Sequence, residues 1–89
     1  YIYNVNHLAN TLIDLNCCDY CGIDQNGIKD LKILQRLNMK HNRNIYDVNH
    51  LANTLIELNC GRSGIYESGI NQNGIKNLKI LQKLNVDYT

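Results

Sequence analysis

The sequence predicts an α/β solenoid of about four repeat units, in which one short strand from each unit joins a parallel sheet. Self-similarity is the first observation: residues 5–13 return almost letter for letter as residues 48–56, and residues 25–38 return as residues 72–85. Such repetition is typical of proteins whose units bury their apolar faces against stacked neighbours. A shorter Leu-x-x-Leu-Asn-apolar pattern is the second observation, and it occurs at residues 12–17, 34–39, 55–60 and 81–86.

The units differ in length. The first copied block is offset by 43 residues and the second by 47, so a four-residue insertion lies within residues 61–71. We expect a single repeat domain over residues 1–89, and because the chain begins with a tyrosine we expect it to be a fragment of a longer array. The approximate units are residues 1–27, 28–47, 48–74 and 75–89.

Each Leu-Asn-apolar segment is predicted to form a strand. Side chains alternate between the two faces of a strand, so the leucine and the apolar residue two positions later point inward, and the asparagine between them points outward. The predicted inward residues are Leu15 and Cys17, Leu37 and Met39, Leu58 and Cys60, and Leu84 and Val86.

The rest of each unit is predicted to be a short helical or irregular return. Val5, Leu8 and Ile28, with their copies, supply apolar side chains that close each unit from the convex side. The Asn-Gly sequences at 26–27 and 73–74 are expected to form turns, because this dipeptide favours tight turns.

The repeated pattern resembles that of the leucine-rich repeat family, L-x-x-L-x-L-x-x-N, whose units span about 20 to 29 residues. Residues 34–42 match it at every fixed position when a methionine counts as the third apolar residue, with Asn42 as the asparagine. Other units depart from it, with Tyr20 and Ser63 at that position and Thr89 ending the chain. The spacing after Asn42 is similar to that of the cysteine-containing subtype. The resemblance implies a curved scaffold with its sheet on the concave face.

An all-α solenoid of helix pairs is the alternative. Val5, Leu8, Leu12 and Leu15 also fit a heptad stripe, and some helix-pair arrays repeat every 40 to 47 residues or thereabouts. Apolar residues that recur every third position over residues 28–37, however, drift around a helix. Asparagine is also a poor helix former, so the pattern favours strands.

Composition excludes several classes of partner. The chain has 9 basic and 8 acidic residues and a net charge of +1, which lacks the basic excess typical of nucleic-acid and anionic-membrane binding. No apolar run approaches the roughly 18 residues of a membrane span. The composition and near-identical copies are similar to those of repeat proteins of amoebae or of the large DNA viruses that infect them. A cytoplasmic location, including host cytoplasm or a virion, is therefore favoured.

The cysteines are the candidates for chemistry. Cys18 and Cys21 have the spacing of a metal or redox pair, and together with Cys17 and a histidine such as His41 they could complete a zinc site. Cys17 and Cys60, however, occupy inward positions of the repeat and are expected to act as small core residues. No nucleophile is paired with a repeated base. We therefore predict a non-catalytic protein without a metal or cofactor, and a metal-binding or redox protein is the least favoured alternative.

Outward-facing residues form columns if the strands stack in parallel at about 4.8 Å. The position before each inward leucine gives a column of alternating charge, which we expect to set the register by cross-strand pairing worth at most about 1 kcal/mol for each exposed pair. The outward asparagines give a second column, which we expect to form hydrogen bonds along the sheet. The charge column is Asp14, Arg36, Glu57 and Lys83, and the asparagine column is Asn16, Asn38, Asn59 and Asn85.

The resemblance implies a protein–protein interaction module that binds an unidentified protein with its concave face; the alternative is that this face is only scaffold surface. A structural role is the second hypothesis, because neither end carries a polar capping unit and apolar ends favour head-to-tail self-association. The candidate binding residues are Asp14, Asn16, Arg36, Asn38, Lys40, Glu57, Asn59, Arg62, Lys83, Asn85 and Tyr88.

Overall fold

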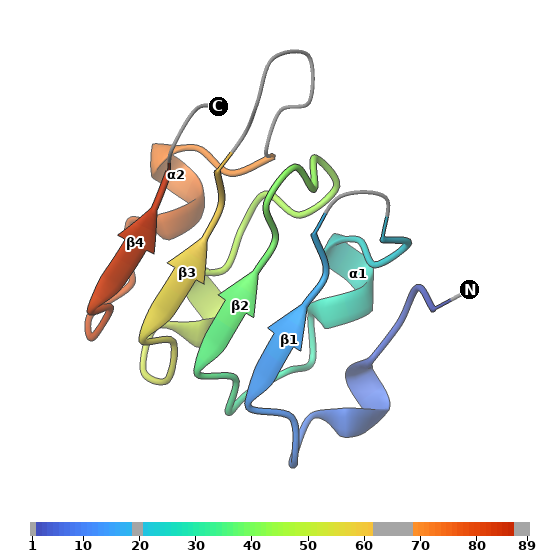
Figure 1. Ribbon diagram of the computed structural model, residues 1–89. Helices are drawn as coiled ribbons and strands as arrows, with labels where there is room; N and C mark the ends of the chain where they lie inside the picture. The colour runs from blue at the N-terminus through green and yellow to red at the C-terminus, as the bar shows by residue number, and fades with distance from the viewer. Residues whose placement is uncertain (1, 19–20, 62–68, 87–89) are drawn as a thin grey trace.

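A four-stranded parallel sheet in the order β1-β2-β3-β4 forms the centre of the computed structural model, which describes residues 2–18, 21–61 and 69–86. Figure 1 shows the strands side by side, with helices α1 and α2 behind the sheet. The α/β class is therefore confirmed, and the all-α alternative is wrong. The strands are β1 (Asp14–Asn16), β2 (Arg36–Asn38), β3 (Glu57–Asn59) and β4 (Lys83–Asn85). The helical turns are η1 (Asn6–Leu8), α1 (Gln25–Ile28), η2 (Asn49–Leu51) and α2 (Gln72–Ile75).

Each strand follows one helical turn, and we call each such combination a layer. The first layer is η1 with β1, the second α1 with β2, the third η2 with β3 and the fourth α2 with β4. Parallel strands need a crossover between them, and here the crossover contains the helical turn. The register is the predicted one, with Leu15 beside Leu37, Leu37 beside Leu58, and Leu58 beside Leu84.

The alternating burial predicted for the strands is confirmed in the first three. Cys17, Leu37 and Leu58 are buried against the return segments, where Ile28 and Leu51 have no exposed surface. The fourth strand differs from the prediction. Its two inward residues, Leu84 and Val86, are 46% and 58% exposed, because no described residue covers them on the side away from β3.

The Asn-Gly sequences lie in helices, so the predicted turns are wrong. The side chain of Asp24 accepts a 2.9 Å hydrogen bond from the backbone nitrogen of Gly27 and thereby caps α1. Asn71 caps α2 in the same way, with Gly74 as the donor at 3.2 Å. An N-cap three residues before the glycine satisfies one of the free amides of the first turn and favours a helix over a tight turn.

Glycine is required in these helices because the neighbouring layer comes very close. A Cβ atom on Gly27 would collide with the carbonyl oxygen of Tyr3, and one on Gly74 would collide with that of Tyr46. Both glycines also accept a 2.9 Å hydrogen bond from the preceding layer, from the backbone nitrogens of Val5 and Val48 respectively. The missing side chain therefore lets two backbones approach.

Among the described residues, Asn42 is the polar side chain buried in the core, with 2% of its surface exposed. Its side-chain nitrogen donates 3.0 Å hydrogen bonds to the carbonyl oxygens of Cys17 and Ile23. Its side-chain oxygen accepts a 2.9 Å bond from the backbone nitrogen of Asn44. The residue at the asparagine position of the repeat pattern thus links the second layer to the loop after β1.

Among the described residues, no helix is long and apolar enough to cross a membrane.

Candidate functional site

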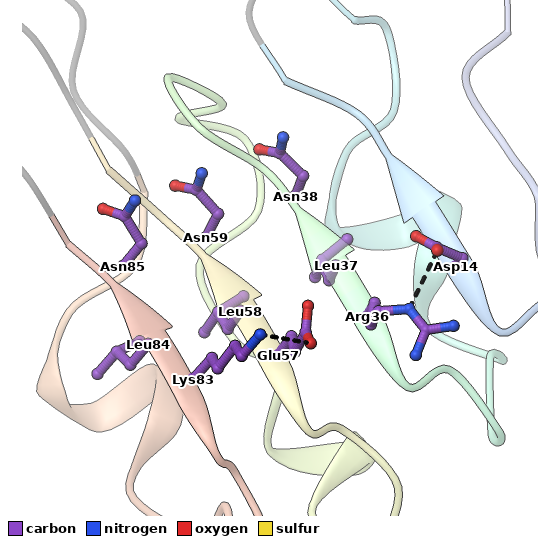
Figure 2. A pocket seen from close by; sticks show the side chains of 10 residues that line it. All are labelled: Asp14, Arg36, Leu37, Asn38, Glu57, Leu58, Asn59, Lys83, Leu84 and Asn85. Atoms are coloured by element: carbon purple, nitrogen blue, oxygen red, sulfur yellow. Dashed lines mark hydrogen bonds and ion pairs between the residues drawn. The ribbon is translucent and has the colours of Figure 1, made fainter.

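The candidate binding residues meet on the open face of the sheet. A shallow groove of about 430 Å³ runs across β1 to β4, and Figure 2 shows the side chains around it. Of the remaining candidates, Asn16 lies beside Asn38 in the register and Lys40 follows β2, whereas Arg62 and Tyr88 lie outside the described residues. The candidates that line the groove are Asp14, Arg36, Asn38, Glu57, Asn59, Lys83 and Asn85.

The charge column pairs as predicted at two of its three steps. Arg36 Nε lies 3.1 Å from Asp14 Oδ2 and also forms a hydrogen bond with it. Lys83 Nζ lies 3.6 Å from Glu57 Oε1. Both ion pairs are drawn as dashed lines in Figure 2, and no ion pair joins Arg36 to Glu57 in the described part of the chain. Because these side chains are well exposed to water, each pair contributes about 1 kcal/mol or less.

The asparagine column does not form the predicted hydrogen bonds along the sheet. The side-chain oxygens of Asn16, Asn38 and Asn59 instead accept bonds of 3.3, 3.1 and 3.1 Å from the backbone nitrogens two residues later. Asparagine favours this local bond where a strand ends, and the bond competes with contacts to neighbouring strands. Within residues 2–18, 21–61 and 69–86, the amide nitrogens of these three side chains have no hydrogen-bond partner.

The cysteines at inward positions are core residues, as predicted. Cys17 and Cys60 are 1% and 5% exposed. Burial, together with the neighbouring sulfurs of Cys21 and Cys18, raises the pKa of the Cys17 thiol to about 12, and burial also raises the pKa of Cys60. A thiolate is the reactive form of cysteine, so both thiols are protonated and unreactive near neutral pH.

No metal centre is assembled from the described residues. They contain no group of three or more histidine, cysteine, aspartate or glutamate side chains placed to hold an ion. None of the four cysteines forms a disulfide bond within the described residues, and Cys18 and Cys21 are half-buried. Cys21 Sγ accepts a 3.4 Å hydrogen bond from the backbone nitrogen of Ile23, so this thiol helps to order the loop before α1.

Gln25 is a contact residue that the sequence prediction did not include. Its side-chain oxygen accepts 3.0 Å hydrogen bonds from the backbone nitrogens of Tyr46 and Asp47, and its side-chain nitrogen donates a 2.7 Å bond to the Asp47 carbonyl oxygen. These bonds join the second layer to the third. The sequence contains a signal for this role, because Gln25 recurs without change as Gln72 in the fourth layer.

No family model matches this chain, and no curated protein or solved structure is significantly similar to it. The assignment of function therefore depends on the residues and their geometry.

Proposed function

We propose that this chain is a leucine-rich repeat solenoid and a non-catalytic interaction module, which binds another protein with the open face of its sheet. Two features support the repeat type. Successive strands place Leu15, Leu37 and Leu58 in register, and Asn42 makes the buried bonds that the asparagine of the repeat pattern can supply. Within such a scaffold, the face opposite the core is the surface free to contact a partner.

The observation that carries the binding proposal is the row of amide groups on that face. Asn16, Asn38 and Asn59 use their oxygens on their own strands and keep their amide nitrogens available as donors. Adjacent strands lie about 4.8 Å apart, so these donors form a regular line across the sheet. A hydrogen bond made by each donor to a partner adds about 0.5 to 1.5 kcal/mol.

The polar and charged side chains of this face favour a polar partner. The amide donors require carbonyl or carboxylate oxygens, and the alternating charges beside them favour a segment that carries charges of both signs. Such electrostatic complementarity gives specificity and a faster association rate more than affinity. The proposed partner is therefore a polar protein segment that lies across the strands.

Charge reversal on the two faces tests this proposal. The face variant combines Arg36→Glu with Lys83→Glu. The matched control combines Lys29→Glu with Lys76→Glu, which makes the same change in net charge at the exposed residues that end α1 and α2 behind the sheet. Each immobilised protein is incubated with extract of the source cells, and captured proteins are quantified by mass spectrometry. We expect a protein captured by the wild type and by the control to be lost from the face variant.

Removal of the amide donors provides a test without any change in charge. The amide variant combines Asn38→Ala with Asn59→Ala. Its control combines Asn10→Ala with Asn53→Ala, two exposed residues of the return segments. Urea unfolding of every variant separates loss of binding from loss of the fold. If the wild type, the charge-reversed face variant and the variant without amide donors capture the same proteins in the same amounts, the sheet face is scaffold surface and the binding proposal is wrong.

A further inference from the structure

We infer that the two end faces of the chain bind each other between copies, so that the first layer of one copy docks on the fourth layer of another. This inference concerns the edges of the sheet and does not depend on what its open face binds. It follows from a comparison of the internal junction between the second and third layers with the two ends.

The internal junction provides the template. Gln25 bonds to the backbone of Tyr46 and Asp47. The Gln35 carbonyl oxygen accepts bonds of 2.8 and 3.1 Å from the backbone nitrogens of Ile56 and Glu57. His50 Nε2 lies 3.1 Å from the carbonyl oxygen of Ile28, which can only accept, so the ring nitrogen donates.

The residues of this junction recur at the two ends. The second and fourth layers are copies of each other, as are the first and third, so a first layer placed after a fourth layer repeats the internal arrangement. On the fourth layer the equivalents of Gln25, Ile28 and Gln35 are Gln72, Ile75 and Gln82. On the first layer the equivalents of Tyr46, Asp47, His50, Ile56 and Glu57 are Tyr3, Asn4, His7, Ile13 and Asp14. The changes from aspartate to asparagine at position 4 and from glutamate to aspartate at position 14 leave the backbone groups that bond at this junction in place.

Apolar side chains that the internal junction buries are exposed at the ends. Ile45 has no exposed surface, whereas its copy Ile2 is 67% exposed. Leu37 is 2% exposed, whereas its copy Leu84 is 46% exposed. Burial of such surface provides about 25 cal/mol per Å², so both ends gain from being covered. The side chains of the two ends have complementary shapes, because their copies pack against each other at the internal junction.

Charge complementarity determines which ends meet. The charge column alternates in sign and ends with Asp14 on β1 and Lys83 on β4, with side chains that are 62% and 77% exposed. A head-to-tail contact brings Lys83 of one copy beside Asp14 of the next and continues the alternation. A contact between two β1 edges or two β4 edges would place like charges together. Edge strands also offer unpaired backbone groups to another strand.

Light scattering on two blocked variants tests the inference in reducing buffer. Ile2→Lys places a charge on the first layer, Val86→Lys places one on the fourth, and Asn53→Lys adds the same charge to an exposed residue of the third layer as a control. We expect the mass of the wild type and of the control to rise with concentration. We expect each blocked variant to remain monomeric alone. In an equimolar mixture, the open fourth layer of Ile2→Lys can bind the open first layer of Val86→Lys, and we expect a dimer that does not grow, because both of its outer layers carry a lysine. The inference is wrong if the wild type stays monomeric up to its solubility limit, or if folded blocked variants associate alone as the wild type does.

Cross-linking provides a second test without substitutions, so a variant that fails to fold does not prevent a decision. Unlabelled and ¹⁵N-labelled wild-type chains are mixed and treated with a zero-length carbodiimide reagent, which joins an amine to a carboxylate in contact. We expect peptides that link Lys83 of one isotope to Asp14 of the other. If mixed-isotope peptides join other residues and this pair is absent, the inferred interface is wrong.

Discussion

The side-chain amide of Asn42 donates a 3.0 Å hydrogen bond to the carbonyl oxygen of Cys17, which lies 25 residues earlier in the chain. The same nitrogen bonds to the Ile23 carbonyl oxygen. One buried side chain therefore satisfies two backbone carbonyl groups of the segment between β1 and α1. Its position makes it a sensitive probe of how the layers are held together.

Asn42→Ala is expected to lower the free energy of unfolding by about 1 to 3 kcal/mol, because it leaves buried carbonyl oxygens without a donor. The measurement is urea unfolding followed by circular dichroism. Asn53→Ala is the control, since this exposed residue makes no side-chain hydrogen bond within the described residues and its loss should change stability by less than about 0.5 kcal/mol. Equal urea midpoints for the two variants would contradict this account of Asn42.

Gly27→Ala is expected to destabilise the protein by about 1 to 3 kcal/mol, because the added methyl group collides with the Tyr3 carbonyl oxygen and must push the first layer away. Helix propensity alone predicts the opposite result, a gain of about 1 kcal/mol. Asn26→Ala, one residue earlier in α1, is the control for the helix itself. A thermal unfolding midpoint for Gly27→Ala at or above that of the wild type would show that the layers do not approach as described.

The buried Cys17 thiol predicts a loss of stability in alkaline solution. Its pKa rises from 9.0 to about 12 on folding, so both states are protonated below pH 9, and above it the unfolded chain loses a proton that the folded chain keeps. The free energy of unfolding therefore falls as pH rises above 9, by up to about 1.4 kcal/mol per pH unit from this one group. Cys17→Val, which uses the residue found at the equivalent position 86, lacks this contribution.

Urea unfolding of the wild type and Cys17→Val between pH 8 and pH 10.5 measures the effect as a difference, so the titration of tyrosine and lysine cancels. The wild type should lose stability relative to the variant as pH rises. A difference that is constant over this range would mean that the thiol is not buried in the folded protein.

A double-mutant cycle on Asp14 and Arg36 should give a coupling free energy of about 0.2 to 1 kcal/mol that disappears in high salt, because the pair is exposed and screened. The same cycle on Arg36 and Glu57 is the matched control, since these neighbours in the register form no ion pair. Urea unfolding of the four proteins in each cycle provides the free energies. A larger coupling for Arg36 with Glu57 would contradict the observed choice of partner.

The strands and their register were predictable from the sequence because the information is periodic. An inward leucine, an outward asparagine and an inward apolar residue define one strand, and repetition at similar spacing aligns the copies. The charge column follows from the same register. For this reason the sequence predicts the charged and asparagine side chains that line the groove and the ion pairs of Arg36 with Asp14 and of Lys83 with Glu57. It does not predict the leucines that also line the groove, Leu37, Leu58 and Leu84, because their alternation places them inward.

The remaining features depend on contacts that a local pattern does not contain. The Asn-Gly sequences form helices because Asp24 and Asn71 cap them and because another layer presses on Gly27 and Gly74. The outward asparagines bond locally, since a backbone amide two residues away is nearer than the next strand. The exposure of Leu84 follows from the absence of a described layer beyond β4, which the alternation of a single strand does not reveal.

The sheet order β1-β2-β3-β4 has a consequence for the route of folding. Every strand pairs with the next strand along the chain, and the paired residues lie 21 to 26 positions apart in the sequence. Because each strand pairs only with its neighbours along the chain, folding that starts at any one interface can propagate in both directions. The pairing of β3 with β4 is the one that spans the insertion within residues 61–71, so the pairings of β1 with β2 and of β2 with β3 can form without that segment being closed.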